Sequence, residues 1–162
     1  MASVNPIPQG FHTLTPNLVL RDCAKAIEFY KKALGAQEIA RMPSPDGKSV
    51  WHAELKIGDS IFMMADEMPG MSRPAPTREN PVPVTLWLYV SDADAAYKRA
   101  IDAGAKSLAA PTDMFWGDRC AGVADPFGYQ WSFATHKKDL SQEEMRRAGE
   151  EFARQQQQQH QG

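Results

Sequence analysis

Two stretches of the chain repeat one pattern seventy residues apart, and this repetition constrains the fold more than any other feature. Residues 17–36 and 87–106 each begin as an apolar strand, continue with helical spacing and end near a glycine. Asp22 and Asp92 stand where each helix would begin, and an aspartate there accepts hydrogen bonds from free backbone N–H groups. A repeated unit this short needs its partner to bury an apolar sheet face, so the sequence predicts two packed modules.

The rest of each repeat predicts three further strands. Gly58 and Gly128 mark two hairpin turns that are again seventy residues apart. Each half therefore reads as strand, helix, strand, strand, strand. We predict an α+β fold of two tandem βαβββ modules, which form a cup-shaped, partly open mixed β-sheet barrel with helices outside. The expected strands are 14–20, 37–42, 49–57, 60–65, 83–90, 106–109, 119–124 and 129–135, and the expected helices are 23–34 and 93–103.

The chain divides into four segments by composition. They are an N-terminal module (1–66), a proline-rich linker (67–82), a C-terminal module (83–139), and a C-terminal helix with a glutamine-rich tail (140–162). Ser141 and Glu144 form the capping-box pair that is typical of a helix start. Met145, Ala148 and Phe152 add a thin apolar stripe to that helix.

Charge and composition exclude several kinds of partner. The net charge of −2 provides no basic field for a nucleic acid backbone, so we expect no nucleic acid partner. Cys23 and Cys120 have no metal-site spacing, and two free thiols fit a reducing compartment. The first residues lack the basic start and apolar run of a signal peptide, and no run of 18 apolar residues predicts a membrane span. We therefore expect a cytoplasmic protein with no membrane partner.

Several motifs resemble a known superfamily. The segments "AIEFYKKALGA" and "DPFGYQW" are similar to those of the vicinal oxygen chelate superfamily, which includes glyoxalases, bleomycin-resistance proteins and dioxygenases. Within it, "WHAELKIGDSIFMMADE" looks most like the PhnB-like branch. The resemblance covers roughly residues 14–139. It implies the fold strongly but says little about chemistry, because this fold hosts lyases, oxygenases, transferases and plain binders.

The resemblance also implies where a divalent metal would be held. Enzymes of the superfamily take His, Gln or Glu ligands from the first and last strand of each module. Carried over by position, the four sites are Thr15, Phe62, Thr85 and Ser132. A phenyl ring cannot bind a metal, and neutral hydroxyls are weak ligands compared with imidazole or carboxylate. We therefore expect no metal and no cofactor in the cup.

Strand alternation predicts which strand side chains line the cup, and the segment "MFWGDRC" (114–120) is a second candidate wall with Trp116, Asp118 and Arg119. The predicted pocket is aromatic and thioether surface with a few polar groups: Thr15, Asn17, His52, Phe62, Met64, Thr85, Trp87, Tyr89, Trp116, Asp118, Arg119 and Ser132. Such a lining suits an apolar or flat ligand. Two alternatives stay open: the rings fill the cup as core, and Asp118 and Arg119 form a solvated ion pair.

Two classes of function fit these observations. The first is a metal-free protein, similar to glyoxalase and bleomycin-resistance proteins, that binds a small apolar or aromatic molecule in the cup between its modules. The second is a lyase- or dioxygenase-type enzyme that acts on a small oxygenated metabolite, with His52 and Glu54 as an atypical metal site or acid–base pair. A vestigial cup in an accessory subunit is a third possibility. The sequence leaves open whether the protein is an enzyme.

We also expect a homodimer near 36 kDa, twice the chain mass of 18.0 kDa. The resemblance implies dimers, some with modules exchanged between chains. The proline-rich linker is stiff and long enough to reach either its own partner module or that of a neighbour.

Overall fold

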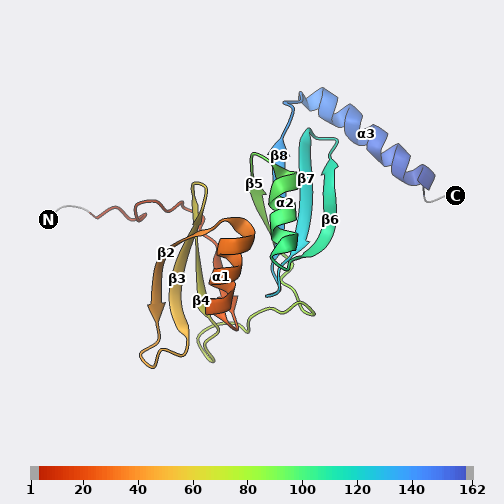
Figure 1. Cartoon of the computed structure of the whole chain (residues 1–162). Coiled ribbons are helices and arrows are strands. Elements are labelled where there is room, and N and C mark those ends of the chain that lie inside the picture. Colours follow the sequence, from red (N-terminus) through yellow and green to blue (C-terminus); the bar gives the residue numbers. More distant parts are fainter. Residues whose placement is uncertain (1–3, 160–162) are drawn as a thin grey trace.

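The computed structural model, which describes residues 4–159, contains two similar βαβββ modules followed by a third helix (Figure 1). The first module comprises β1 (Asn17–Leu20), α1 (Cys23–Leu34), β2 (Gln37–Pro43), β3 (Val50–Ile57) and β4 (Ser60–Asp66). The second comprises β5 (Thr85–Tyr89), α2 (Ala93–Asp102), β6 (Lys106–Asp113), β7 (Asp118–Ala124) and β8 (Gln130–His136), and α3 (Gln142–Gln159) follows. The ends of the predicted first and last segments, residues 1–3 and 160–162, lie outside the described residues.

Each module forms its own four-stranded mixed sheet. Sheet A has the strand order β1-β4-β3-β2, and sheet B has the order β5-β8-β7-β6. The first and last strands of each module pair in parallel, whereas the other neighbours are antiparallel. Within residues 4–159 the two sheets do not join into a closed barrel. The predicted fold class, α+β with two tandem modules, is confirmed.

The first two helices begin and end where their residues predict. The carboxylate of Asp22 accepts a hydrogen bond from the backbone N–H of Lys25 at 3.0 Å, and Asp92 accepts one from Ala95 at 2.9 Å. Gly35 ends α1 in the left-handed conformation, with φ of 68°. In the described part of the chain, no helix is long and apolar enough to cross a membrane.

The two modules pack together through their helix-covered faces. Each helix lies on one face of its own sheet, and α1 and α2 contact each other. At their junction the ring of Tyr30 meets Phe62 and Trp131 edge to face, with centroids 6.0 and 5.3 Å away. One continuous core results, and the opposite face of each sheet remains open.

A fully buried carboxylate, Asp125, fixes this junction. It accepts hydrogen bonds from the hydroxyl of Tyr30 at 2.7 Å and from the indole N–H of Trp131 at 3.0 Å. The backbone N–H groups of Phe127 and Tyr129 donate two more, at 2.8 and 3.0 Å. Since Tyr30 belongs to α1 and the others to the last hairpin, this network joins the two modules.

The two hairpins differ by one residue, although their glycines repeat. In the first, Ile57 pairs with Ser60 across a two-residue turn. In the second, the N–H of Asp125 donates to the carbonyl of Tyr129, which leaves three residues in the turn. Gly58 is the first of two turn residues, whereas Gly128 is the last of three, so corresponding residues beyond the turn are sixty-nine apart rather than seventy. The strand pairing agrees. Asn17 lies opposite Met63, and Trp87, seventy residues after Asn17, lies opposite Ser132, which is sixty-nine residues after Met63.

The second hairpin glycine has no room for a side chain. Gly128 has φ of +94°, and a Cβ there would lie 2.6 Å from the carbonyl oxygen of Thr77 in the linker. Gly58 also has a positive φ, +58°, but a Cβ there would meet nothing within 4 Å. A side chain at either position would therefore strain the backbone, but only at Gly128 would it also clash with the linker.

We predict that Gly128→Ala destabilises the protein far more than Gly58→Ala. Strain at a positive φ should cost Gly58→Ala about 1 kcal/mol. The added clash with the linker backbone should raise the cost for Gly128→Ala to about 3 kcal/mol or more. Urea denaturation of both variants measures the difference. Equal losses would contradict the proposed contact between the linker and this hairpin.

Candidate functional site

The open faces of the two sheets differ in side-chain size at corresponding positions. In sheet A, Glu54 lies opposite Met63. In sheet B, Gly122 lies opposite Ser132, the counterpart of Met63. Two residues earlier in each strand stand His52 and Cys120. Small residues therefore occupy the middle of sheet B where sheet A has long polar ones.

A cavity of about 380 Å³ lies over the open face of sheet B. Its walls include the aromatic rings of Trp87, Phe115, Trp116 and Phe152. The remaining lining residues are Ala109, Ala110, Thr112, Asp113, Met114, Cys120, Ala121, Gly122 and Ser132. Apart from Asp113 these residues are uncharged, which suits an apolar or aromatic ligand fixed by few polar contacts.

The β6–β7 connection places two of these rings. The N–H of Met114 donates to the carbonyl of Asp118 at 2.7 Å, and the N–H of Gly117 donates to Met114 at 3.1 Å. Within this turn the rings of Phe115 and Trp116 pack edge to face, with centroids 5.1 Å apart. The turn is therefore a rigid support for the cavity wall.

Next to the cavity, Asp118 is buried and fully hydrogen-bonded. Its side chain is 4% exposed, and its carboxylate accepts from Tyr89 Oη and Trp116 Nε1, each at 3.2 Å. His136 Nδ1 lies 2.7 Å from it, and the other ring nitrogen of His136 lies 3.0 Å from Asp139. Burial alone would raise the pKa of Asp118, but the hydrogen bonds from these donors outweigh it and lower that pKa. Asp118 thus holds Trp116 and Tyr89 in place.

Arg119 does not pair with Asp118, so the predicted solvated ion pair between them is wrong. Its guanidinium instead binds Asp94 of α2 at 2.5 and 2.9 Å and Asp113 of β6 at 3.1 Å. Hydrogen bonds to Asp94 and Asp113 raise the pKa of Arg119. Neighbouring residues of a strand point to opposite faces, which explains why Asp118 and Arg119 have different partners.

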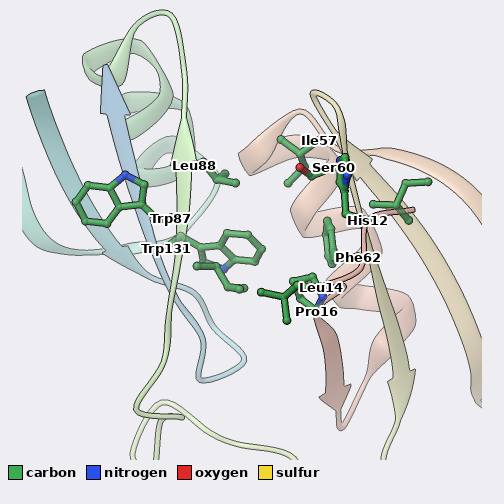
Figure 2. Close-up of a pocket in the computed structure, with 11 residues that line it drawn as sticks. His12, Leu14, Pro16, Ile57, Ser60, Phe62, Trp87, Leu88 and Trp131 are labelled. Carbon is green, nitrogen blue, oxygen red and sulfur yellow. The ribbon is translucent and has the colours of Figure 1, made fainter. Parts of the chain in front are cut away.

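A second cavity, of about 230 Å³, lies between the two modules (Figure 2). Phe62 of the first module and Trp131 of the second both line it, and their rings meet edge to face with centroids 5.9 Å apart. His12, Leu14 and other residues complete the lining. In Figure 2 the ring of Trp87 points away from this gap, to the other side of β5 from Leu88 and Trp131. Trp87 borders both cavities.

The predicted orientation of Phe62 and Met64 is wrong. Both are buried on the helix-covered face of sheet A, because they lie opposite Leu55 and Ala53. The prediction counted four residues from each hairpin glycine. Asp59 still belongs to the first turn after Gly58, whereas no turn residue follows Gly128, so the count is one residue short in the first hairpin. The residue that corresponds to Ser132 is Met63.

The structure brings together three of the other predicted pocket residues and leaves the rest outside the sheet B cavity. Trp87, Trp116 and Ser132 line that cavity. Tyr89, Asp118 and Arg119 lie in the hydrogen-bond and ion-pair networks beside it. Thr15, Asn17, His52 and Thr85 line neither cavity.

The residues at the expected ligand positions do not fit a divalent metal. Thr15 donates its hydroxyl to the carbonyl of His12 at 2.9 Å. Thr85 and Ser132 also offer neutral hydroxyls, and a thioether, Met63, takes the fourth position. His52 Nε2 lies 3.0 Å from Glu54 Oε1, but the described residues hold no cluster of three or more His, Cys, Asp or Glu suited to a metal.

Comparison with known proteins identifies the family. The model of the "Glyoxalase/Bleomycin resistance protein/Dioxygenase superfamily" matches residues 11–133. The chain belongs to this superfamily. An uncharacterized protein of Mycobacterium bovis is 43% identical over 138 residues, which cover 83% of this chain and 90% of that protein.

Several solved structures share the fold. An Arabidopsis thaliana gene product is 32% identical, with a TM-score of 0.60 over 76% of this chain and 98% of its own. TioX from Micromonospora is 24% identical, with a TM-score of 0.63 over 77% of this chain and 98% of its own. At that identity TioX supports the fold alone.

Sequence reasoning missed the parts of the cavity that β6 and α3 supply. The predicted strand ended at residue 109, before Pro111, but β6 continues to Asp113 with a register shift between Ala109 and Thr112. An edge strand tolerates proline and a bulge, so the position of this strand in the sheet was the missing information. Phe152 had no signal beyond the thin stripe of α3.

Cys120 also lines the cavity, but its environment does not activate it. Burial and the negative charge of Asp118 raise the pKa of its thiol. A thiol with a raised pKa stays protonated near neutral pH and is a poor nucleophile.

We predict that His136 makes stability depend on pH. Hydrogen bonds to Asp118 and Asp139 raise the pKa of His136 above its ordinary value of 6.5. Its stabilising effect is therefore complete below pH 6.5 and is lost as the pH rises through the folded-state pKa. In thermal melts, His136→Gln should remove this part of the pH dependence. The neighbouring Lys137 and Lys138 stay charged throughout this pH range and so do not replace it.

His12→Gln is the matched control, since it leaves the Asp118 network intact. It should keep the wild-type profile. A His136→Gln profile parallel to wild type across this range would contradict the prediction.

Proposed function

We propose that the protein binds a small apolar or aromatic molecule, without a metal, in the cavity over sheet B. The observation that carries this proposal is the lining, in which four aromatic rings surround small residues and few polar groups. Rings provide a large contact area and prefer to stack on or edge against a flat ligand. The volume of about 380 Å³ falls in the range of cavities that hold one small molecule.

The polar groups at this cavity support binding rather than catalysis. Asp118 already accepts from three side chains, so it is a poor general base. The raised pKa of Cys120 disfavours a thiolate nucleophile. Ser132 and Thr112 remain as hydroxyls that can orient a ligand. The superfamily name covers both enzymes and resistance proteins, so membership alone does not choose between them.

The alternative function, a lyase- or dioxygenase-type enzyme, would depend on His52 and Glu54. These two side chains bind each other on sheet A and line neither cavity. Two protein ligands are fewer than the three that catalytic zinc sites supply. We therefore rank this alternative second. The homodimer expected from the sequence stays a prediction.

We predict that Trp87→Ala weakens binding of N-phenyl-1-naphthylamine, a neutral aromatic fluorescent probe, by about tenfold. Trp51→Ala is the matched control, because Trp51 and Trp87 are 44% and 45% exposed and Trp51 lines neither cavity. Fluorescence titration measures both affinities. Equal weakening in the two variants, or none in Trp87→Ala, would contradict the proposed position of the site.

We also predict that the protein holds no tight divalent metal. Protein purified without a metal-affinity tag and then supplied with zinc, iron, manganese or nickel should show no stoichiometric metal in elemental analysis. Near-stoichiometric metal that His52→Ala removes would instead support the enzyme, since that substitution deletes the imidazole of the His52–Glu54 pair.

A further inference from the structure

The C-terminal helix α3 lies beyond the residues that match the superfamily. The family model ends at residue 133, and α3 spans Gln142–Gln159. Figure 1 shows α3 at the end of the second module, away from the first. This helix therefore lies outside the residues that the family model matches, and its contacts indicate what it contributes.

The segment before α3 is attached to the turn that carries the cavity rings. The backbone N–H groups of Lys137 and Lys138 both donate to the carbonyl of Gly117, at 3.0 and 3.1 Å. A Cβ at Gly117 would lie 2.4 Å from the carbonyl oxygen of Lys138, so the two chain segments are in close contact. Ser141 and Glu144 then exchange capping hydrogen bonds that start the helix. The start of α3 is thus fixed relative to the cavity.

The middle of α3 contacts the cavity wall directly. The ring of Phe152 lies 5.3 Å from that of Phe115, with an interplanar angle of 32°. Gly149 also lies beside the Phe115 ring, since a Cβ there would be in ordinary van der Waals contact with it at 3.4 Å. In the described part of α3 no side chain is buried in the core. The tilted contact between the rings of Phe115 and Phe152 is therefore its main apolar contact with the module.

Part of the Phe152 side chain is exposed and can contact a ligand. Its side chain is 41% exposed although it lines the cavity, whereas Met145, also 41% exposed, does not line it. We propose that α3 is a wall of the ligand site and that Phe152 stacks on a flat aromatic ligand opposite Trp87 and Trp116. This inference rests on the proposed binding function and adds a specificity-determining residue outside the part of the chain that the family model matches.

The charges around the cavity define the ligand further. Among the lining residues Asp113 alone is charged, and its carboxylate binds Arg119. Arg119 in turn is directed toward Asp94 and Asp113 rather than into the cavity. No lining residue supplies a cation for an anionic group, so the site should take neutral or cationic aromatic molecules and disfavour anionic ones.

Two dyes and two variants of the full chain test the proposal. N-phenyl-1-naphthylamine is neutral, and 8-anilinonaphthalene-1-sulfonate has the same ring system with one sulfonate added. Phe152→Ala should weaken binding of the neutral dye by about tenfold, because one stacking ring is lost. Met145→Ala, equally exposed on the same helix, should change it by less than about twofold. The wild-type protein should bind the sulfonated dye more weakly than the neutral one.

Each outcome decides a separate point. If wild-type protein binds the neutral dye and Trp87→Ala weakens it while Phe152→Ala does not, the role of α3 is overturned and the proposed function stands. If the sulfonated dye binds more tightly, the ligand class is overturned. If neither dye binds, the proposed function and this inference are both rejected. Thermal melts of the two helix variants should agree, which shows that a loss of binding is not a loss of folding.

Discussion

The buried carboxylate of Asp125 is the interaction on which the arrangement of the two modules depends. A buried charge is costly unless hydrogen bonds surround it, and Asp125 receives four of them. Two come from the backbone of its own turn and one from Trp131 of the same module. The fourth comes from Tyr30 of α1, so the turn is satisfied fully only when the first module is docked. Burial and the negative charge of Asp125 raise the pKa of Tyr30, which keeps its hydroxyl protonated as a donor. Removal of either partner would leave a buried polar group unpaired.

The same hairpin fixes the linker and the edge of sheet A. Because Gly128 has no side chain, the backbone of Thr77 can pass close to it. The N–H of Val82 donates to the carbonyl of Gly128 at 3.0 Å. The hydroxyl of Tyr129 lies 2.9 Å from both the N–H and the carbonyl of Val19, on the free side of β1. The second hairpin therefore binds the linker, α1 and β1 at once.

The helix bounds, which depend on local residues, were predicted well from the sequence. The errors concerned side-chain orientation and cavity walls, which tertiary contacts determine. α1 has its predicted bounds of 23–34 and α2 ends one residue early, because aspartate caps and glycine stops act locally. The orientation of Phe62 and Met64 failed because the two hairpin glycines occupy different places in their turns, which only the strand pairing reveals. Of the site, Trp87 and Ser132 were predictable from strand alternation, and Trp116 was predictable from the aromatic segment before Gly117. The contribution of Phe152 was not, because it depends on a contact with Phe115, thirty-seven residues earlier.

The two modules share one backbone plan, and substitutions at matched positions make their open faces chemically different. In sheet A the middle of the open face is filled by His52 and Glu54, which satisfy each other's polar atoms. In sheet B the matched residues are Cys120 and Gly122, whose small volumes leave space above the strands. Ring-bearing residues then enclose that space from β5, from the β6–β7 turn and from α3. A cavity over one module therefore requires small residues in the sheet and large ones at its border. Duplication supplied two equivalent surfaces, and this distribution of side-chain size explains why the aromatic cavity lies over sheet B.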